Sequence, residues 1–329
     1  MKTTIKQVAI KAGVSTMTVS RVVNNYPNIK PETRDKVQKV IEEIHYKPNE
    51  IARTLVVQKS KIISLMVPDI VNPFFTEMIK CAEQDTKKLG YNLLIADAGW
   101  TIQNEIDFVQ ASIGRMSDGV ILVTPRLSKK QISELNQQVP IVVVDRNLRE
   151  KDIKCVFVDN YYGVYKGVEY LISLGHKNIG YIKGIDDVQN TKRREQGYID
   201  ALKAHGIKYN PDNTTEGGYT SKTGYAAYDF FFSKKIIPTA IFASNDLMAY
   251  GLISACKDHG LNVPNDISIM GFDNISLPID TTPSLTTISH PINKMINKAI
   301  SILLNQKIDE KDKLKNELII RDSVKKLEV

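Results

Sequence analysis

The sequence predicts an α/β protein that has a small all-α head and a body of two parallel sheets. Three observations support this fold class. From residue 61 onward, short β-rich runs alternate with amphipathic stretches, and the alternation occurs in two successive series. The first 45 residues instead show apolar side chains at helical spacing. Strand–helix alternation is typical of parallel sheets that are covered by helices on both faces. With 329 residues, the chain is long enough for separate domains.

The head begins with three short amphipathic patterns. Residues 4–12 carry a helical apolar stripe that Thr4 can cap and that Gly13 ends. A second helix is expected to start after Ser15, and a third near Pro31. The side chains expected inside are Ile5, Val8, Ala9, Ala12, Val19, Val22, Val23, Val37, Val40, Ile41 and Ile44. Two short helices joined by a tight glycine turn, with a third completing a core, predict a helix-turn-helix domain, which we place at residues 1–47.

The charge of this head points to nucleic acid. Residues 1–60 hold 11 Lys and Arg against 5 Asp and Glu, so they carry six of the seven net positive charges of the chain. A basic module suits a phosphate backbone, and short polar side chains at the start of the second helix can reach base edges. Helical hairpins that bind no DNA are the alternative. The candidate DNA contacts are Thr4, Ser15, Thr16, Met17, Thr18, Ser20, Arg21 and Asn24.

The string TIKQVAIKAGVSTMTVSRVVNN closely resembles the signature of the lactose repressor/galactose repressor (LacI/GalR) family of bacterial regulators. The resemblance continues through IEEIHYKPNEIARTL and reaches LIIRDSV near the end of the chain. It implies an operator-binding dimer whose affinity is set by a small effector. It also implies a body that is two-lobed and periplasmic-binding-protein-like.

The resemblance further implies that residues 48–60 form a hinge that folds on DNA. By this likeness Leu55 would wedge between base pairs in the minor groove, and Leu55→Ala would weaken operator binding alone. Ala52 would permit close approach, while Asn49 and Arg53 would touch the backbone or groove. A plain interdomain linker is the alternative.

The body is expected at residues 61–329. Predicted strands lie at 61–68, 91–97, 118–125, 140–146 and 156–160, then at 178–184, 239–244 and 266–273. Helical stretches lie near 74–89, 103–115, 129–138, 161–175, 191–205, 222–235 and 246–260. The resemblance implies three crossings between lobes, near Asn160, Ser289 and Arg321. Lobe 1 would then comprise about 61–160 and 290–329, including a last helix (292–304) and a strand (318–320), and lobe 2 about 161–289.

Ligands of open α/β sheets bind beyond the carboxyl ends of the strands, so polar residues there are candidates. A sugar needs Asp, Asn or Arg groups for its hydroxyls and an aromatic face for its ring. The polar and aromatic residues expected beyond the strand ends are Asp69, Asn72, Phe74, Phe75, Asp97, Thr124, Arg126, Asp145, Arg146, Asn190, Arg194, Tyr219, Asn245, Asp246 and Asp273. The resemblance assigns effector binding to Arg194, Asn245, Asp273, Tyr219 and the Phe74–Phe75 pair, and adds Asn160. Helix capping by the aspartates and plain core packing by the phenylalanines are the alternatives.

The sequence does not favour an enzyme. It contains no GxxxxGK[ST] loop, GxSxG elbow or GxGxxG fingerprint, and its five histidines are scattered, so we expect no catalytic residues, metal or cofactor. A sugar-processing enzyme with a basic appendage, a solute-binding protein, and a regulator controlled by a phosphorylated protein are the alternatives.

We therefore expect a sequence-specific DNA-binding repressor of carbohydrate-utilisation genes, controlled allosterically by a sugar-like effector. Its partners would be a palindromic double-stranded operator, the effector and a second copy in a homodimer. The dimer surface would include the helix near 74–89 and the strand after it. No apolar run is long enough for a membrane and the three cysteines lie far apart, so we expect a cytoplasmic protein.

Overall fold

The computed structural model describes residues 3–46, 59–150, 152–277, 282–306 and 314–327. It divides into two compact units, Met1–Ser60 and Lys61–Val329, each of which is described by itself. An all-α head and a body of parallel sheets confirm the predicted fold class.

The head is a three-helix core. Helix α1 (Ile5–Ala12) starts with a capping box between Thr4 and Gln7 and ends at Gly13, which has a φ of 61°. The side chain of Ser15 caps α2 (Thr16–Val23), and α3 (Pro31–Glu43) begins at a proline. Seven side chains from the three helices are buried together: Val8, Ala9, Ala12, Val19, Val22, Val37 and Val40.

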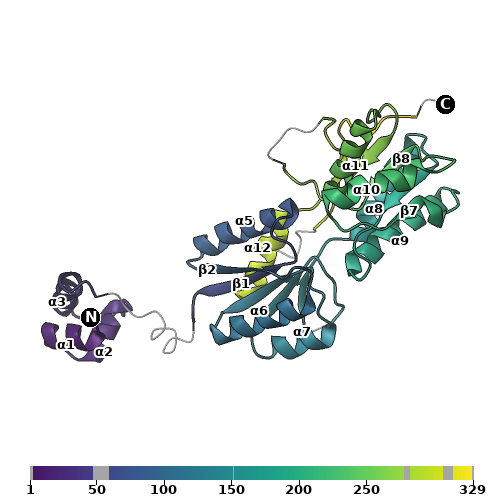
Figure 1. Ribbon diagram of the computed structural model, residues 1–329. Helices are drawn as coiled ribbons and strands as arrows, with labels where there is room; N and C mark the ends of the chain where they lie inside the picture. Colours follow the sequence, from purple (N-terminus) through teal and green to yellow (C-terminus); the bar gives the residue numbers. More distant parts are fainter. Residues whose placement is uncertain (1–2, 47–58, 151, 278–281, 307–313, 328–329) are drawn as a thin grey trace. The chain divides into compact units, whose positions relative to one another are not determined.

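The first lobe contains a five-stranded parallel sheet in the order β2-β1-β3-β4-β5. Its strands are β1 (Ile62–Val67), β2 (Asn92–Asp97), β3 (Gly119–Val123), β4 (Ile141–Val144) and β5 (Lys154–Val156). In the central register Leu65 lies opposite Ile95 and Ile121. Helices α5 (Pro73–Lys88) and α12 (Ile292–Leu303) pack side by side on one face, and α6 (Ile102–Gly114) and α7 (Lys129–Asn136) cover the other (Figure 1).

The second lobe repeats this plan with a four-stranded parallel sheet in the order β7-β6-β8-β9. The strands are β6 (Ile179–Ile182), β7 (Thr214–Thr215), β8 (Ala240–Ala243) and β9 (Ser268–Met270). Helices α8 (Asn160–Ser173) and α9 (Gln189–Ala204) pack on one face; α10 (Ser221–Phe232) and α11 (Asp246–Asp258) pack on the other. A 3₁₀ turn (Pro211–Asn213) precedes β7.

The chain crosses between the lobes after β5, after β10 (Thr287–Ser289) and before β11 (Glu317–Ile319). The predicted placement of the strand near 318–320 in lobe 1 is wrong. Strand β11 pairs antiparallel with β10, and Leu318 packs against the core on the α8 side of lobe 2. After it, the Ile269 N–H donates to the Ser323 carbonyl and the Leu327 N–H to that of Leu174, so the C-terminal segment completes lobe 2.

One strand of the first lobe also differs from its prediction. Strand β5 lies at Lys154–Val156, before most of the predicted run 156–160, because α8 already begins at Asn160 and Asp159 caps it. In the described part of the chain, no helix combines the length and the apolar character needed to cross a membrane.

Candidate functional site

A pocket lies where the two lobes meet, with about 340 Å³ of space between its walls, part of it open to solvent. Both lobes contribute to its lining, mostly from loops at the carboxyl ends of strands, which is where parallel sheets place their ligand sites. The lining residues are Asn72, Phe74, Phe75, Trp100, Thr124, Asp145, Val188, Asn190, Arg194, Tyr219, Asn245 and Asp273.

The backbone of the pocket is unusual. Thr124 follows β3 and Asp145 follows β4, with φ values of 45° and 58°. Tyr219 and Asp273 also have positive φ, at 59° and 112°. Non-glycine residues rarely adopt this conformation, and such strain gathers at functional sites.

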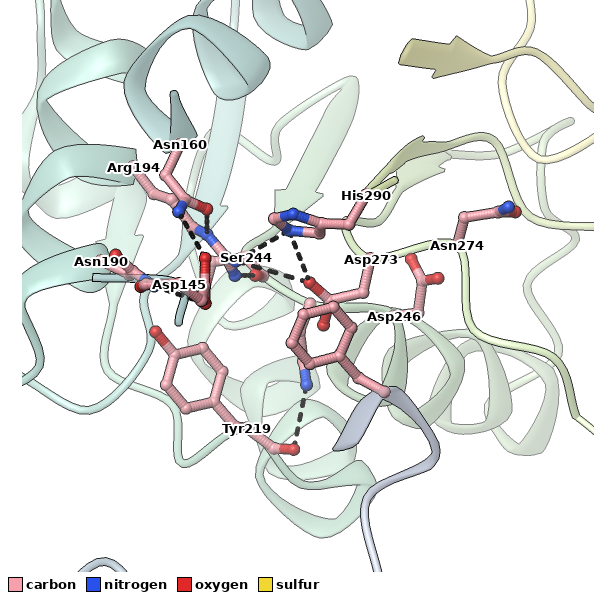
Figure 2. Close-up of polar contacts among 12 residues, drawn as sticks. Asp145, Asn160, Asn190, Arg194, Tyr219, Ser244, Asp246, Asp273, Asn274 and His290 are labelled. Atoms are coloured by element: carbon pink, nitrogen blue, oxygen red, sulfur yellow. Dashed lines mark hydrogen bonds and ion pairs between the residues drawn. The ribbon is translucent and has the colours of Figure 1, made fainter. Parts of the chain in front are cut away.

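Arg194 is the centre of a buried polar network (Figure 2). Its Nε donates to Asn160 Oδ1 over 2.9 Å, and its Nη1 donates to the Ser244 carbonyl oxygen. Nη2 lies 3.4 Å from Asp273 Oδ1, and the guanidinium lies 4.0 Å from the centre of the Phe272 ring. Burial alone would lower the pKa of Arg194, but Asp273 and the other acidic groups around it raise that pKa above its usual value. The guanidinium is therefore charged inside the protein.

Asp145, which follows β4 in lobe 1, connects the two lobes through hydrogen bonds from Asn160 and Asn190 of lobe 2. Its carboxylate accepts hydrogen bonds from Asn190 Nδ2 at 2.7 Å, from Asn160 Nδ2 at 3.2 Å and from Thr124 Oγ1 at 3.2 Å. Burial raises the pKa of Asp145, while His290 and Arg194 act against the rise. Asn160 does not line the pocket itself, because its amide is used to join Asp145 to Arg194.

Two further titratable side chains lie behind the pocket. His290 Nε2 is 3.5 Å from Asp273 Oδ1, and the His290 ring contacts those of Phe74 and Phe272 at 5.1 Å. Asp246, the first residue of α11, accepts from the Ile275 N–H and the Thr287 hydroxyl. Burial and the charge of Asp273 raise the pKa of Asp246 to about 8.

Aromatic rings form the less polar part of the pocket. The rings of Phe75 and Trp100 meet edge to face at 6.1 Å, and Trp100 stacks on Tyr219 with centroids 5.9 Å apart. The Tyr219 hydroxyl bonds to that of Thr191 over 2.7 Å. We call Phe75, Trp100 and Tyr219 the aromatic wall; lobe 1 supplies the first two residues and lobe 2 the third. A ligand there would meet flat apolar surface on one side and a charged network on another.

The structure gathers most of the candidate site residues of the body. Ten of the fifteen strand-end candidates line the pocket: Asn72, Phe74, Phe75, Thr124, Asp145, Asn190, Arg194, Tyr219, Asn245 and Asp273. The other five, Asp69, Asp97, Arg126, Arg146 and Asp246, are not part of its lining. Asn72 and Asn245 also cap α5 and α11 through their side-chain oxygens, so capping and pocket lining coexist. Sequence reasoning missed Trp100 and His290. The signal for Trp100 was its place just after the β2 strand end, in the string DAGW.

In the head, the structure separates exposed candidates from those with structural roles. Thr16, Met17 and Arg21 are exposed on α2, and Thr18 and Ser20 are half-buried. Thr4 and Ser15 cap helices, and Asn24 Nδ2 donates to the Ser20 carbonyl over 2.8 Å. Four hinge candidates, Asn49, Ala52, Arg53 and Leu55, lie outside the described residues. Within the described ranges, no group of three or more His, Cys, Asp or Glu side chains could hold a metal ion.

Comparisons with known proteins find matches to both the head and the body of the chain. Residues 4–49 match the family model of bacterial regulatory proteins, lacI family, and residues 168–324 match a periplasmic binding protein-like domain. The HTH-type transcriptional repressor CytR of Escherichia coli (strain K12) is 36% identical over 330 residues, covering 98% of this chain and 97% of the relative.

Solved structures show the same fold. A lac repressor dimer bound to operator and the anti-inducer ONPF aligns with a TM-score of 0.86 at 24% identity, covering 99% of this chain and 100% of that one. A LacI family transcriptional regulator from Enterococcus faecium, with bound ribose, gives 0.71 at 27% identity, covering 81% and 100%. From its head, its two-lobed body and its nearly full-length similarity to CytR, the chain belongs to the lacI family of bacterial regulatory proteins.

Proposed function

We propose that this protein is a transcriptional repressor of carbohydrate-utilisation genes whose affinity for its operator is set by a small sugar-like effector bound between the two lobes. One observation carries the proposal: a buried arginine, two aspartates and an aromatic wall, drawn from both lobes, surround a single pocket. The planar donors and acceptors suit adjacent hydroxyls, and the wall suits the apolar face of a ring. The ribose-bound relative supports a ligand of this class.

The head would bind DNA. Its exposed α2 residues Thr16, Met17 and Arg21 would enter the major groove, and the basic surface around them would bind phosphates. Residues 48–60 would serve as the hinge, with Leu55 in the minor groove. The relatives named as repressors support this role. No catalytic role is proposed for any residue, and the site of action would be the cytoplasm.

A homodimer on a palindromic operator would follow from the same scheme. Strand β2 is at the edge of the first-lobe sheet, where Ile95 is exposed; Ile70 and Val71, just before α5, are exposed as well. An exposed sheet edge with apolar side chains is suited to pairing with a second copy. Sedimentation is expected to show a dimer that does not grow to a tetramer.

Ligand binding and operator binding would be coupled by the angle between the two lobes. Ligand bound in the pocket contacts both lobes, so it favours one angle between them, and the angle sets the spacing of the dimer surfaces at α5 and β2. The two hinges then either fit the minor groove or do not. The ligand releases the operator if the angle that it favours prevents this fit, and it promotes operator binding if that angle permits the fit.

The test has two measurements on the full chain. Selection from a random duplex pool is expected to return a palindromic sequence, and a thermal-shift screen of sugars, sugar acids and nucleosides is expected to return a ligand that alters affinity for that sequence. If no duplex is preferred over bulk genomic fragments with any of these compounds present, the proposal fails. Turnover of a sugar or phosphosugar would favour the enzyme alternative, and retention of a phosphorylated protein would favour the protein-controlled one.

A further inference from the structure

Trp100 is held in a backbone conformation that a bulky side chain rarely adopts. Its φ is 56°, and the preceding Gly99 has the same value. Large residues in this region are outliers, and such an outlier persists only where the surroundings enforce it. The feature therefore points to a role for the indole in its present position.

The surroundings do enforce it. Asp97 Oδ1 accepts from the Gly99 N–H over 2.7 Å, and the Trp100 N–H donates to the Pro68 carbonyl. Arg126 Nη1 donates to the Trp100 carbonyl over 2.7 Å, and the same guanidinium reaches Asp187 of lobe 2 at 3.4 Å. The loop after β2 is thus tied to its own lobe on both sides of the indole and, through Arg126, to the other lobe.

The indole faces the pocket, where it is half-buried and forms the middle of the aromatic wall. Tyr219, its stacking partner, is fixed by its own positive φ and by the bond of its hydroxyl to Thr191. The hydroxyl bond holds the Tyr219 ring, and the indole packs against the rings of Phe75 and Tyr219, so the wall presents an aromatic surface to the pocket. The charged groups that line the same pocket, Arg194, Asp145 and Asp273, would engage a polar ring edge.

We infer that Trp100 is a specificity-determining residue of the pocket: its indole, stacked with the Tyr219 ring, recognises the flat face of a ring-shaped ligand and selects cyclic ligands over open-chain ones. The inference rests on the proposed function, because it deepens the ligand class of that same pocket. The flat face can belong to a sugar ring or to the base of a nucleoside, and the two sources share the same stacking chemistry.

The test uses the full chain and the fact that Trp100 is its single tryptophan. The probes are D-ribose, its open-chain counterpart ribitol, and adenosine. We expect a saturable change in tryptophan emission with D-ribose or adenosine and none with ribitol. A response to D-ribose identifies a sugar ring as the stacked face, and a response to adenosine alone identifies the base.

Substitutions of Trp100 distinguish a loss of ligand recognition from a loss of folding. By calorimetry, Trp100→Leu is expected to weaken the responding probe by about 10-fold, while Trp100→Phe, which keeps an aromatic face, stays within about 3-fold. Tyr162→Leu, at an exposed aromatic residue on α8 outside the pocket, is the matched control and is expected to bind like the parent. Thermal unfolding verifies that each variant is folded.

The inference is overturned if a ring-shaped probe binds without changing the emission, if Trp100→Leu binds it as tightly as the parent, if ribitol binds as well as D-ribose, or if none of the three probes binds. Operator selection is measured separately on the parent chain. A parent that selects an operator while failing these arms overturns the role of Trp100 alone, and a parent that selects none overturns the proposed function.

Discussion

At the level of single residues, several pocket side chains are polar or charged although they are buried, and several pocket residues have a positive backbone φ. Arg194 makes four polar contacts inside the protein, and each contact leads to a different element: Asn160 on α8, Ser244 after β8, Asp273 after β9 and His290 after β10. A ligand that engages this guanidinium is therefore sensed by several segments at once.

Arg194→Ala is expected to abolish the response to effector and leave operator binding intact. The reason is that it removes the only charged donor lining the pocket among the described residues and leaves Asp145 and Asp273 without their cation. Breaking a buried pair from one side costs roughly 3–5 kcal/mol of stability, so the melting temperature should fall as well. The measurement is operator binding by fluorescence anisotropy, with and without effector.

The neighbouring arginine supplies the control for this prediction. Arg193 is half-exposed and pairs with Asp159 at 3.3 Å on the outside of lobe 2, so Arg193→Ala should change neither the response nor the stability by much. An Arg194→Ala protein that responds normally at the parent's effector concentration would show that the guanidinium does not bind the ligand.

Gly184→Ala is expected to weaken effector binding without loss of DNA binding. A methyl group at position 184 would collide with the ring and hydroxyl of Tyr219, so the ring must leave its place in the aromatic wall. Gly206→Ala is the steric control, because nothing lies near a methyl group there, although its φ of 70° costs some stability. Calorimetry with the ligand from the screen checks this, and unchanged affinity in Gly184→Ala would exclude Tyr219 from binding.

At the scale of elements, the head shows how one helix separates stability from recognition. At the start of α2, the Ser15 side chain accepts a hydrogen bond from the Thr18 N–H, whereas the Met17 side chain is 63% exposed. The two positions are only two residues apart, yet they should respond to substitution in different ways.

Ser15→Ala is expected to cost about 1 kcal/mol of head stability, because the Thr18 N–H loses its 3.1 Å cap acceptor. Met17→Ala should leave that stability unchanged and alter the preferred operator sequence instead. Hydrogen exchange of α2 amides in the full chain measures the first effect, and duplex selection measures the second. Equal exchange rates in parent and Ser15→Ala would contradict the capping role, and an unchanged sequence preference in Met17→Ala would remove it from the base contacts.

Elements with a clear apolar period could be predicted from the sequence. Helices α1 and α2 begin and end close to the predicted residues because their caps and apolar stripes are local signals. Strand β5 could not be located to the residue, since Val156 and Val158 are both buried and only the start of α8 decides where pairing ends. The partner of β11 was also out of reach, because pairing with β10 is a tertiary choice.

The residues of the candidate site also divide into those that could be predicted from the sequence and those that could not. Arg194, Asp145 and Asp273 could be predicted, as they follow from the rule that ligands bind at strand ends. Trp100 could not, because an aromatic residue after a strand is as compatible with a core as with a pocket, and only the fold of its loop shows which. His290 reaches Asp273 from the crossing between lobes, a contact that no local pattern encodes.

At the scale of the whole molecule, the second lobe is joined to the crossing strands through buried acids. Asp246 accepts hydrogen bonds from Ile275 and from Thr287 of β10, so it ties α11 to both segments. Because it is fully enclosed and close to Asp273, it holds a proton that a solvated aspartate would release. The stability of the fold should therefore depend on pH.

The direction of this dependence follows from the pKa of Asp246, which is about 8 in the fold and near 3.8 when solvated. Between these values the native state keeps a proton that the unfolded chain has lost, so the free energy of unfolding should fall as pH rises, by at most about 1.4 kcal/mol per pH unit. Asp246→Asn should flatten this slope in denaturant titrations of the full chain. Asp258→Asn, exposed at the other end of α11, is the control. An equal slope in Asp246→Asn and the parent would refute the assignment.

Helix α12 has a consequence for how the molecule is made. It contributes six buried side chains to the lobe that contains β1, yet all of the second lobe except β11 and the C-terminal segment precedes it in the sequence. The six are Ile292, Met295, Ile296, Ala299, Ile300 and Leu303. While a ribosome extends the chain from its N-terminus, the earlier lobe keeps one face of its sheet partly bare until almost all of the protein has been synthesised. The nascent chain thus completes its first-made half nearly last, and a truncated transcript would yield a product with that apolar face open to chaperones.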